Sequence, residues 1–248
     1  MAEISGHLPR PDGHRLAFRK LEGAGPCVLW FGGFASDLTG TKAQALSDWA
    51  LAAGRSFIRF DYFGHGGSSG AFQEGTITRW RQDALAVIDE LAVGEVVIVG
   101  SSMGGWIACL AALARPERIG ALVLIAPAAD FTEALIRPSL SAQARREIET
   151  TGVWRLPSSY EAAGIPVSRG LLEDGARWSI LQGPVGITAP VQILQGGRDE
   201  DVPWRHALEL FQALESQRAV FTLIKDGDHR LSRPQDLARL IAAVENAV

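Results

Sequence analysis

Two serines of the chain lie at the centre of a G-x-S-x-G pattern, the spacing at which a serine can act as an exposed nucleophile. One is Ser102, in residues 100–104, and the other is Ser68, in residues 66–70. A serine at a sharp turn from strand to helix adopts a strained backbone, and its neighbours two positions away must be very small. The chain contains 27 glycines, so an accidental match is expected and the pattern alone cannot identify the nucleophile.

The segments around each serine separate the two. Ser102 follows a β-branched run at 96–99 and precedes an apolar, alanine-rich run that ends at Ala114. Ser68 follows several turn residues and precedes a loop-like segment. We therefore predict that Ser102 is the nucleophile and that Ser68 belongs to a Gly/Ser turn. Ser101, which precedes the nucleophile position, is predicted to be structural.

A serine hydroxyl is a weak nucleophile until a neighbouring base takes its proton, so a histidine is needed. The chain has 5 histidines: His7, His14, His65, His206 and His229. His229 follows the apolar run 220–224 in a predicted strand-to-helix loop, where alternating strand-and-helix folds place their functional groups. His7 and His14 precede the core strands. His65 lies in a Gly-rich turn, and His206 falls in a predicted helix, where a solvated side chain is expected. We predict that His229 is the general base.

The third member of such a system is a carboxylate that fixes the tautomer of the imidazole and stabilises its cation. Three acidic residues follow the apolar run 191–194, namely Asp199, Glu200 and Asp201. Asp199 lies in the turn itself, whereas Asp201 directly precedes Val202 and Pro203, a position at which an acidic side chain often caps a helix. We predict Asp199 as the acid, with Asp201 as the alternative. The chain order serine, acid, histidine is then satisfied.

The oxyanion formed during acyl transfer needs two backbone donors. One should be the N–H of Met103, the residue after Ser102. The other should come from the turn 32–34, and we select Phe34 because Gly33 lets the backbone approach closely. A donor of this type contributes roughly 3 kcal/mol. The alternative is that these glycines form a plain turn.

Short apolar runs alternate with amphipathic segments along the chain, which indicates strands alternating with helices. The predicted strands are 28–31, 57–60, 96–99, 121–125, 191–194 and 220–224, with a weaker strand pair around 15–20. The predicted helices are 41–53, 77–91, 103–114, 204–214 and 235–248. Because several strands are continuous β-branched runs, both faces of the sheet should be covered. We predict an α/β fold, with a mostly parallel twisted sheet and helices on both faces.

The segment 128–187 interrupts this alternation, because it holds no clear strand and a single predicted helix, 132–151. An insertion of this length in a compact α/β domain is typical of a functional lid. Its tryptophans and leucines give it side chains to bury, and the alternative is a disordered or purely structural insertion. We predict a single domain over 1–248, with 128–187 as a small helical lid.

Composition disfavours several classes of protein. The 248 residues carry a formal net charge of -4, which is ordinary for a globular protein and weakly disfavours a nucleic-acid partner. No phosphate loop, dinucleotide fingerprint or zinc-ligand spacing occurs, so we expect no metal and no organic cofactor. No apolar stretch has the length of a membrane span, and no signal pattern opens the chain. With Cys27 and Cys109 expected as buried thiols, we predict a cytoplasmic location.

Beyond these positions, the chain resembles the α/β-hydrolase family of acyl-protein thioesterases that includes α/β-hydrolase-domain-containing protein ten. The likeness runs from about Leu16 to the C-terminus and is carried by residues 40–43, 58–62, 100–106, 152–154, 202–204 and 228–230. The Gly-Thr-Lys, Gly-Val-Trp and Asp-His-Arg pieces are the most specific, because catalysis does not in general require them. The resemblance implies an α/β-hydrolase fold and a serine esterase that removes long acyl groups from cysteine thioesters or cleaves acyl glucuronides. The animal protein carries a mitochondrial targeting segment, whereas this chain begins almost directly at the domain, which favours a bacterial cytoplasmic relative.

The combined prediction is a two-step acyl transfer in which Ser102 attacks an ester or thioester carbonyl and water then hydrolyses the acyl-enzyme. The substrate would be a small-molecule or acylated-protein ester or thioester, and a lid rich in leucine and tryptophan would suit an acyl chain. The alternatives are a carboxylesterase for small esters and a non-catalytic ligand-binding receptor on the same fold. The oligomeric state is left open.

Overall fold

The centre of the molecule is an eight-stranded sheet. In the computed structural model, which describes residues 3–158 and 162–248, the strand order is β1-β2-β4-β3-β5-β6-β9-β10. The bounds are β1 Ile4–Pro9, β2 Arg15–Leu21, β3 Ala24–Phe31, β4 Arg55–Phe60, β5 Val96–Ser101, β6 Ile119–Ile125, β9 Val191–Gly196 and β10 Ala219–Ile224. Strand β2 runs antiparallel to both of its neighbours, and the remaining pairs are parallel. The predicted mostly parallel sheet is confirmed.

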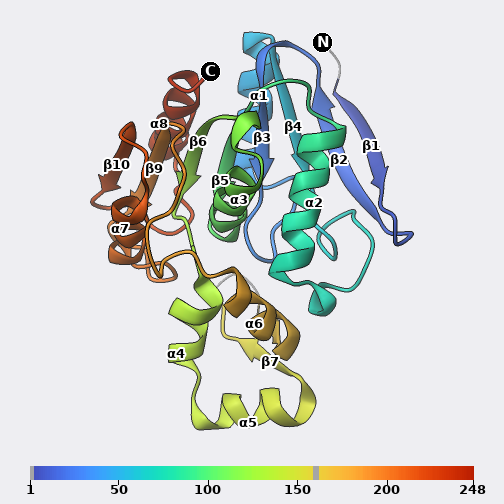
Figure 1. The fold of residues 1–248 in the computed structure, drawn as a ribbon, viewed down its shortest axis with the longest axis vertical. Helices are drawn as coiled ribbons and strands as arrows, with labels where there is room; N and C mark the ends of the chain where they lie inside the picture. The colour runs from blue at the N-terminus through green and yellow to red at the C-terminus, as the bar shows by residue number, and fades with distance from the viewer. Residues whose placement is uncertain (1–2, 159–161) are drawn as a thin grey trace.

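Helices cover both faces of this sheet, as Figure 1 shows. Helices α1 (Thr41–Ala53) and α8 (Pro234–Glu245) pack on one face, and α2 (Ile77–Glu90), α3 (Met103–Ala114) and α7 (Trp204–Ala213) pack on the other. Each face has its own cluster of buried apolar side chains, so the sheet lies between two cores. All five helices were predicted, with small differences at their ends.

The central strands are buried because their sequences are continuous apolar runs rather than alternating ones. All six residues of β5 are buried. The weaker strand pair predicted near residues 15–20 is also present, since β1 pairs with β2 from Ile4 opposite Lys20 to Pro9 opposite Arg15. The predicted apolar runs thus correspond to β3, β4, β5, β6, β9 and β10, and the weaker pair corresponds to the edge of the sheet that ends in β1.

The segment predicted as a lid lies between β6 and β9 and forms a separate lobe at one end of the molecule (Figure 1). The prediction of one continuous helix over 132–151 was wrong. A π-helical turn (Thr132–Ile136) leads into the short helix α4 (Arg137–Ser139), and the chain then breaks before α5 (Ala142–Thr151) begins.

The helix breaks at Leu140 and Ser141. Leu140 ends α4 with an extended backbone, φ -65° and ψ 120°, two residues after Pro138. Ser141 is the N-cap of α5, and its hydroxyl accepts a hydrogen bond from the Ala144 amide at 3.1 Å. Amphipathic spacing continues across both positions, which is why the sequence indicated one helix.

The lid also contains a short antiparallel hairpin that was not predicted. Strands β7 (Val153–Leu156) and β8 (Ile165–Ser168) pair along their whole length, and α6 (Arg169–Gly175) follows. The expectation that the lid holds no strand was therefore wrong. Each strand has four residues, and Pro166 weakens the pattern further, because proline is confined to strand edges and ends.

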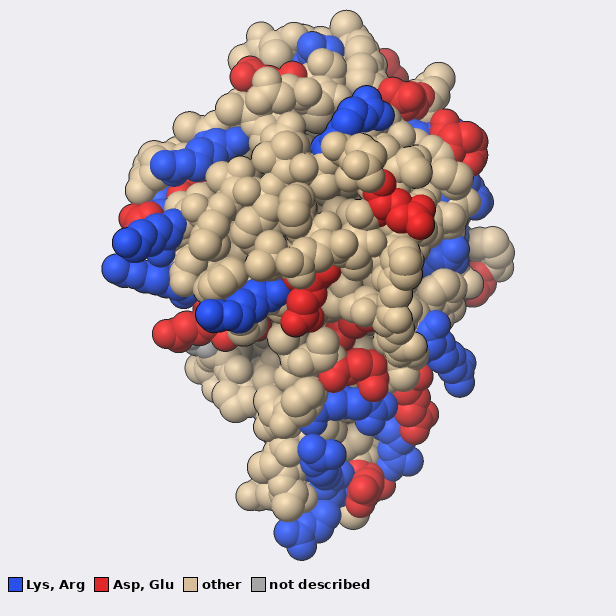
Figure 2. Space-filling view, turned by 60° about the vertical axis from the view of Figure 1, so that its left-hand side comes forward, with Lys and Arg blue, Asp and Glu red and all other residues tan. Residues whose placement is uncertain are grey.

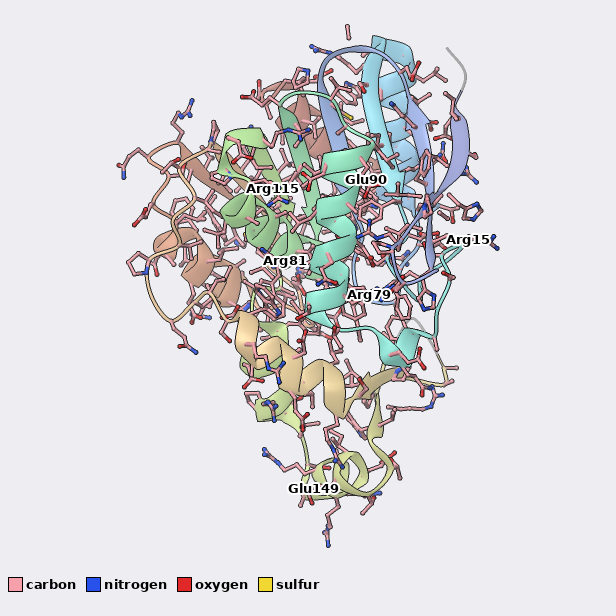
Figure 3. The ribbon with its side chains drawn as sticks, turned by 45° about the vertical axis from the view of Figure 1, so that its right-hand side comes forward. Arg15, Arg79, Arg81, Glu90, Arg115 and Glu149 are labelled. Atoms are coloured by element: carbon pink, nitrogen blue, oxygen red, sulfur yellow. The ribbon has the colours of Figure 1, made fainter. Side chains whose placement is uncertain are left out.

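Helix α2 joins the lid to the body. The Thr78 amide and hydroxyl each donate to the Asp174 carboxylate at 2.7 Å. The Trp178 indole donates to the Thr78 hydroxyl at 2.7 Å, and the Arg81 guanidinium lies 4.5 Å from the centre of the Trp178 ring. In Figure 3, Arg79 and Arg81 lie in the first turns of α2, at the end nearest the lid. The lid is held against this helix by polar and cation–π contacts.

The two ends of the lid are joined through Asp130. Its backbone has a positive φ of 53°, and its carboxylate accepts hydrogen bonds from the amides of Ile180 and Leu181 at 2.9 Å. Burial raises the pKa of Asp130, although these amides oppose the effect. The start of the insertion is thereby fixed to its end.

Short turns, the two cysteines and the surface charges complete the description of the fold. Short 3-10 turns occur at Phe72–Glu74, Pro116–Arg118 and Ala176–Trp178. Cys27 and Cys109 are both buried, as predicted. In the part of the chain that the structure describes, no helix combines the length and apolarity needed to cross a membrane. Figure 2 shows basic and acidic side chains interspersed around a broad uncharged area on the face that it presents.

Candidate active site

Ser102 lies at the turn between β5 and α3, where the sequence pattern placed the nucleophile. Its backbone has φ 54° and ψ -119°, a conformation that residues other than glycine rarely adopt. The Ser102 amide donates to the Ile125 carbonyl at 2.9 Å, which links the turn to the end of β6. Strain of this kind persists only where surrounding contacts enforce it, and it is common at functional sites.

The two outer glycines of the pattern are explained by close backbone contacts. A Cβ at Gly100 would lie 2.5 Å from the Gly104 carbonyl oxygen, and a Cβ at Gly104 would lie 2.1 Å from the Phe31 carbonyl oxygen. Neither space can hold a side chain. The spacing of the pattern is therefore a packing requirement of the turn between β5 and α3.

The structure brings His229 and Asp199 to Ser102 from two other loops. His229 follows β10, and its Nε2 lies 3.2 Å from the Ser102 hydroxyl oxygen. Its Nδ1 lies 2.9 Å from Asp199 Oδ2. The three predicted residues thus form one chain of hydrogen-bond contacts, with the geometry needed to pass a proton from serine to histidine.

Asp199 is held firmly in this position. Its side chain is fully buried, and its Oδ1 accepts hydrogen bonds from the amides of Asp201 at 3.0 Å and Val202 at 2.8 Å. Its Oδ2 also accepts from Gln195 Nε2 at 3.0 Å. Asp201, the alternative acid, is exposed and reaches Asp199 through its backbone amide. The structure therefore pairs Asp199, rather than Asp201, with His229.

The same group has the composition of a metal site. Ligand atoms of Asp199, Asp201 and His229 lie within 4.8 Å of one another. Both oxygens of Asp199 are already engaged by hydrogen bonds, and one of them faces the imidazole. These contacts fit a carboxylate that orients a histidine better than a carboxylate that binds a cation.

The two predicted oxyanion donors come from α3 and from the loop after β3. Met103 is the buried first residue of α3, and Phe34 is half-buried in the loop after β3. A Cβ at Gly33 would lie 3.4 Å from the Ser102 Cβ, so this loop does approach the nucleophile closely. The Ser36 hydroxyl donates to the Gly33 carbonyl at 2.8 Å and stabilises the turn. Both predicted donors line the same cavity as Ser102.

That cavity has a volume of about 920 Å³ and is lined by both apolar and polar side chains. The lid supplies the apolar residues Phe131, Leu135, Ile136, Leu156 and Ile165. Polar lining residues from outside the lid include Asp37, Thr41, Lys42, Glu200, Asp201, Arg230 and Ser232. Ser102 and His229 also line this cavity. An ester with one apolar and one polar substituent would match this lining.

Comparison with known proteins identifies the family. A family model described as "Alpha/beta hydrolase family" matches residues 28–240. The chain belongs to this family. Palmitoyl-protein thioesterase ABHD10, mitochondrial, of Rattus norvegicus is 37% identical over 244 residues, which cover 97% of this chain and 81% of the rat protein.

Two solved structures are similar to this hydrolase over nearly all of its length. A putative hydrolase from Agrobacterium vitis S4 has a TM-score of 0.96 and 40% identity, with both chains fully covered. Alpha/beta hydrolase domain-containing protein 10 from mouse has a TM-score of 0.90 and 35% identity, with 98% of this chain and 97% of the mouse chain covered. The predicted α/β-hydrolase fold and family resemblance are confirmed, and the protein is a hydrolase of the esterase and thioesterase class.

The serine of the second G-x-S-x-G pattern has structural contacts. The Ser68 hydroxyl donates to the Asp61 carbonyl at 2.6 Å and accepts from the Ala17 amide at 2.8 Å, so it holds a turn against β2, as predicted. Ser101 is the buried last residue of β5, which agrees with a structural position.

Two histidines outside the site are also buried. His65 Nδ1 contacts the Phe63 carbonyl at 3.1 Å, and burial lowers the pKa of His65 to about 4. The prediction that His206 is solvated was wrong. It is 6% exposed, and its Nε2 lies 2.7 Å from the Ala129 carbonyl oxygen at the start of the lid.

Sequence reasoning missed one residue that supports the site of this hydrolase. Gln195 is completely buried at the end of β9, and its amide donates to Asp199 and to the Val202 carbonyl, each at 3.0 Å. A polar residue that ends an apolar strand and precedes two glycines is the signal that could have indicated it, because a buried amide needs partners.

Proposed function

We propose that the protein is a serine hydrolase that cleaves long-chain acyl thioesters, with oxygen esters as additional substrates. The observation that carries this proposal is the contact chain from Ser102 through His229 to Asp199 on the wall of a cavity to which the lid supplies apolar side chains. Each residue has one role in it: Ser102 is the nucleophile, His229 the general base and Asp199 the orienting acid.

The reaction proceeds in two steps. Ser102 Oγ attacks the acyl carbonyl carbon while its proton passes to His229 Nε2, and the thiol or alcohol leaves with that proton. Water then attacks the acyl-enzyme, with His229 again accepting a proton, and the free acid and Ser102 are released. Asp199 holds the imidazole with its Nε2 free to accept, and it stabilises the cation formed in each step.

The backbone amides of Phe34 and Met103 are the proposed oxyanion donors. The Met103 amide lies at the N-terminus of α3, where amides are free of intrahelical partners and the helix dipole favours negative charge. The closeness of Gly33 to Ser102 supports the placement of Phe34 beside it. Removal of one such donor typically reduces turnover by about 10² to 10³-fold.

The apolar side chains that the lid supplies to the cavity support a long acyl group as the substrate. Phe131 and Leu135 precede or lie within the π-helical turn of the lid, and Leu156 and Ile165 come from its hairpin. The rat relative is named as a palmitoyl-protein thioesterase, and it is 37% identical to this chain. Apolar burial of an acyl chain contributes about 0.8 kcal/mol for each CH₂ group, so affinity should rise with chain length.

Covalent labelling and a chain-length series test this proposal. A fluorophosphonate probe should label the wild type and Ser68→Ala, whereas Ser102→Ala should remain unlabelled. The value of kcat/KM should rise from acetyl to palmitoyl thioesters. Labelling that persists in Ser102→Ala would overturn the assignment of the nucleophile. A preference for acetyl oxygen esters would instead support a small-ester carboxylesterase, and an absence of labelling and turnover would support a non-catalytic binding protein.

The cytoplasmic location and the absence of a nucleic-acid partner stay predictions. The curated name of the rat relative includes the word mitochondrial, which is said of that protein. Fractionation of cells that express a tagged full-length chain would measure the location directly, and recovery with a membrane or organelle fraction would contradict the prediction.

A further inference from the structure

Lys42 is a basic residue at an unfavourable position. It is the second residue of α1, and the first turn of this helix contains no acidic residue and has no side-chain cap. A cation at the N-terminus of a helix is opposed by the helix dipole. Lys42 is half-buried, and it lines the cavity that contains Ser102 and His229. Residues that break a local electrostatic rule often do so for a functional reason.

The side chain of Lys42 connects α1 with the loop that carries His229. Its Nζ donates to the carbonyl oxygen of Arg230, the residue directly after His229, at 2.5 Å. The two residues are 188 positions apart in the chain. A hydrogen bond from an ammonium group is about twice as strong as one between neutral groups. The contact therefore fixes the backbone one residue from the proposed general base.

Other contacts hold the same loop at different points. The Arg198 amide donates to the Gly227 carbonyl at 2.8 Å, before His229, and the Leu231 amide donates to Asp228 Oδ1 at 2.9 Å. The Arg230 carbonyl accepts one further hydrogen bond, from the Ser232 hydroxyl at 3.0 Å, which belongs to the same loop. The Lys42 side chain thus joins this carbonyl to α1, a separate element of the fold.

We propose that Lys42 is a positioning residue for His229: its ammonium group holds the Arg230 carbonyl and thereby keeps the imidazole at hydrogen-bond distance from Ser102. This inference rests on the proposed function, because it assigns Lys42 to the same site. Misplacement of a reacting group by about 1 Å can reduce a rate by about 10²-fold, so loss of this contact should be measurable in turnover.

The charge on Lys42 also makes the contact dependent on pH. Burial, followed by the positive charge of Arg230, lowers the pKa of Lys42 to about 8, and Asp228 and Asp199 partly oppose this. The other charged groups that line the cavity are Asp37, Glu200 and Asp201. Below about pH 8 the ammonium is present, and above it the neutral amine is a weaker donor. Turnover should therefore decline on the alkaline side.

Two substitutions at this position separate charge from packing. Lys42→Met keeps the length of the side chain but removes the donor, and Lys42→Arg keeps a cation whose pKa lies far above the range tested. Lys225→Met is the matched control, because Lys225 is an exposed lysine close to His229 in sequence but outside the cavity. The assay is kcat and KM for the 4-nitrophenyl ester of octanoic acid between about pH 6 and pH 10, with thermal unfolding recorded for each variant.

We expect Lys42→Met to lower kcat by about ten- to a hundredfold at neutral pH with little change in KM. We also expect it to lose the alkaline decline near pH 8 that the wild type shows. Lys42→Arg should restore most of kcat and move the decline to higher pH, while Lys225→Met should match the wild type. Fluorophosphonate labelling of Ser102 in Lys42→Met should be slower by a similar factor.

Three results would overturn the inference. They are an unchanged kcat in Lys42→Met, an increase in KM alone, which would indicate a substrate contact, and an alkaline decline that stays at the same pH in Lys42→Arg. The last result remains decisive if Lys42→Met does not fold. An active, Ser102-labelled wild type combined with any of these results refutes the role of Lys42 alone, whereas an unlabelled and inactive wild type refutes the proposed function itself.

Discussion

Replacing Asp199 with asparagine is a sharp test of the proposed acid, because the structure specifies what each carboxylate oxygen does. Oδ1 accepts hydrogen bonds from the amides of Asp201 and Val202. Oδ2 accepts one from Gln195 and faces His229 Nδ1. An asparagine has one acceptor oxygen, which the two amides require, so its NH₂ group would face the imidazole and the glutamine.

This arrangement selects the wrong tautomer of His229. A donor opposite Nδ1 favours an imidazole that carries its proton on Nε2, and such an imidazole cannot accept the proton of Ser102. In serine hydrolases the loss of this orientation lowers kcat by about 10⁴-fold, which corresponds to about 5.4 kcal/mol in the activation free energy. The NH₂ group would also face the donor amide of Gln195, which should lower the free energy of unfolding by about 1–3 kcal/mol.

The assay is kcat for a soluble ester at neutral pH, with circular dichroism and urea unfolding to show that each variant is folded. Asp201→Asn is the matched control, because that side chain is exposed and its contact with Asp199 comes from the backbone. We expect the control to stay within about threefold of the wild type. Loss of turnover in Asp201→Asn, with turnover kept in Asp199→Asn, would refute the assignment of the acid.

Three further predictions follow from packing, substrate and pH. Gly104→Ala should lower the free energy of unfolding by about 3 kcal/mol or prevent folding, because its Cβ would lie 2.1 Å from the Phe31 carbonyl oxygen. Urea unfolding measures this against Gly183→Ala, at a position with nothing within 4 Å, and equal stabilities would contradict it. Leu135→Asn should raise KM for palmitoyl thioesters by about tenfold and leave acetyl thioesters unchanged, and equal effects on both would place the acyl chain elsewhere. Burial lowers the pKa of His65 to about 4, below the usual histidine value of about 6.5, so its contribution to stability is complete above about pH 6.5 and declines by about 3 kcal/mol as the pH falls toward 4. His65→Gln should lack this decline in unfolding experiments across that range, and a parallel decline in both proteins would show that another group is responsible.

Much of the body of the fold was predictable because local composition and tertiary environment agree there. The residues of β5 are all apolar or small, they are all buried, and the strand is central in the sheet. The turn at Ser102 was predictable for a similar reason, since Gly100 and Gly104 fill spaces that no other residue could occupy. In each case the residue types of one short segment indicate the local structure, although Gly104 is required by its contact with Phe31 on β3.

The lid was less predictable because its structure depends on contacts between distant segments. Strand β8 is stabilised by its pairing with β7 and contains a proline, so its own sequence gives little indication of a strand. His206 lies on an ordinary amphipathic helix, and its burial follows from the Ala129 carbonyl, 77 residues earlier in the chain. The contact between Lys42 and Arg230 spans 188 residues and has no local signal.

The position of the site follows from the order and direction of the strands rather than from spacing along the chain. Phe34, Ser102, Asp199 and His229 come after β3, β5, β9 and β10, which all run parallel in one sheet. The carboxyl ends of parallel strands meet at the same edge, so their loops converge there whatever their separation in sequence. Strand β6 lies between β5 and β9, and the chain that leaves its carboxyl end is the lid. This insertion supplies Phe131, Leu135, Ile136, Leu156 and Ile165 to the cavity that contains Ser102. A change of acyl-chain preference should therefore map to the lid between β6 and β9, while the other four loops keep the chemistry constant.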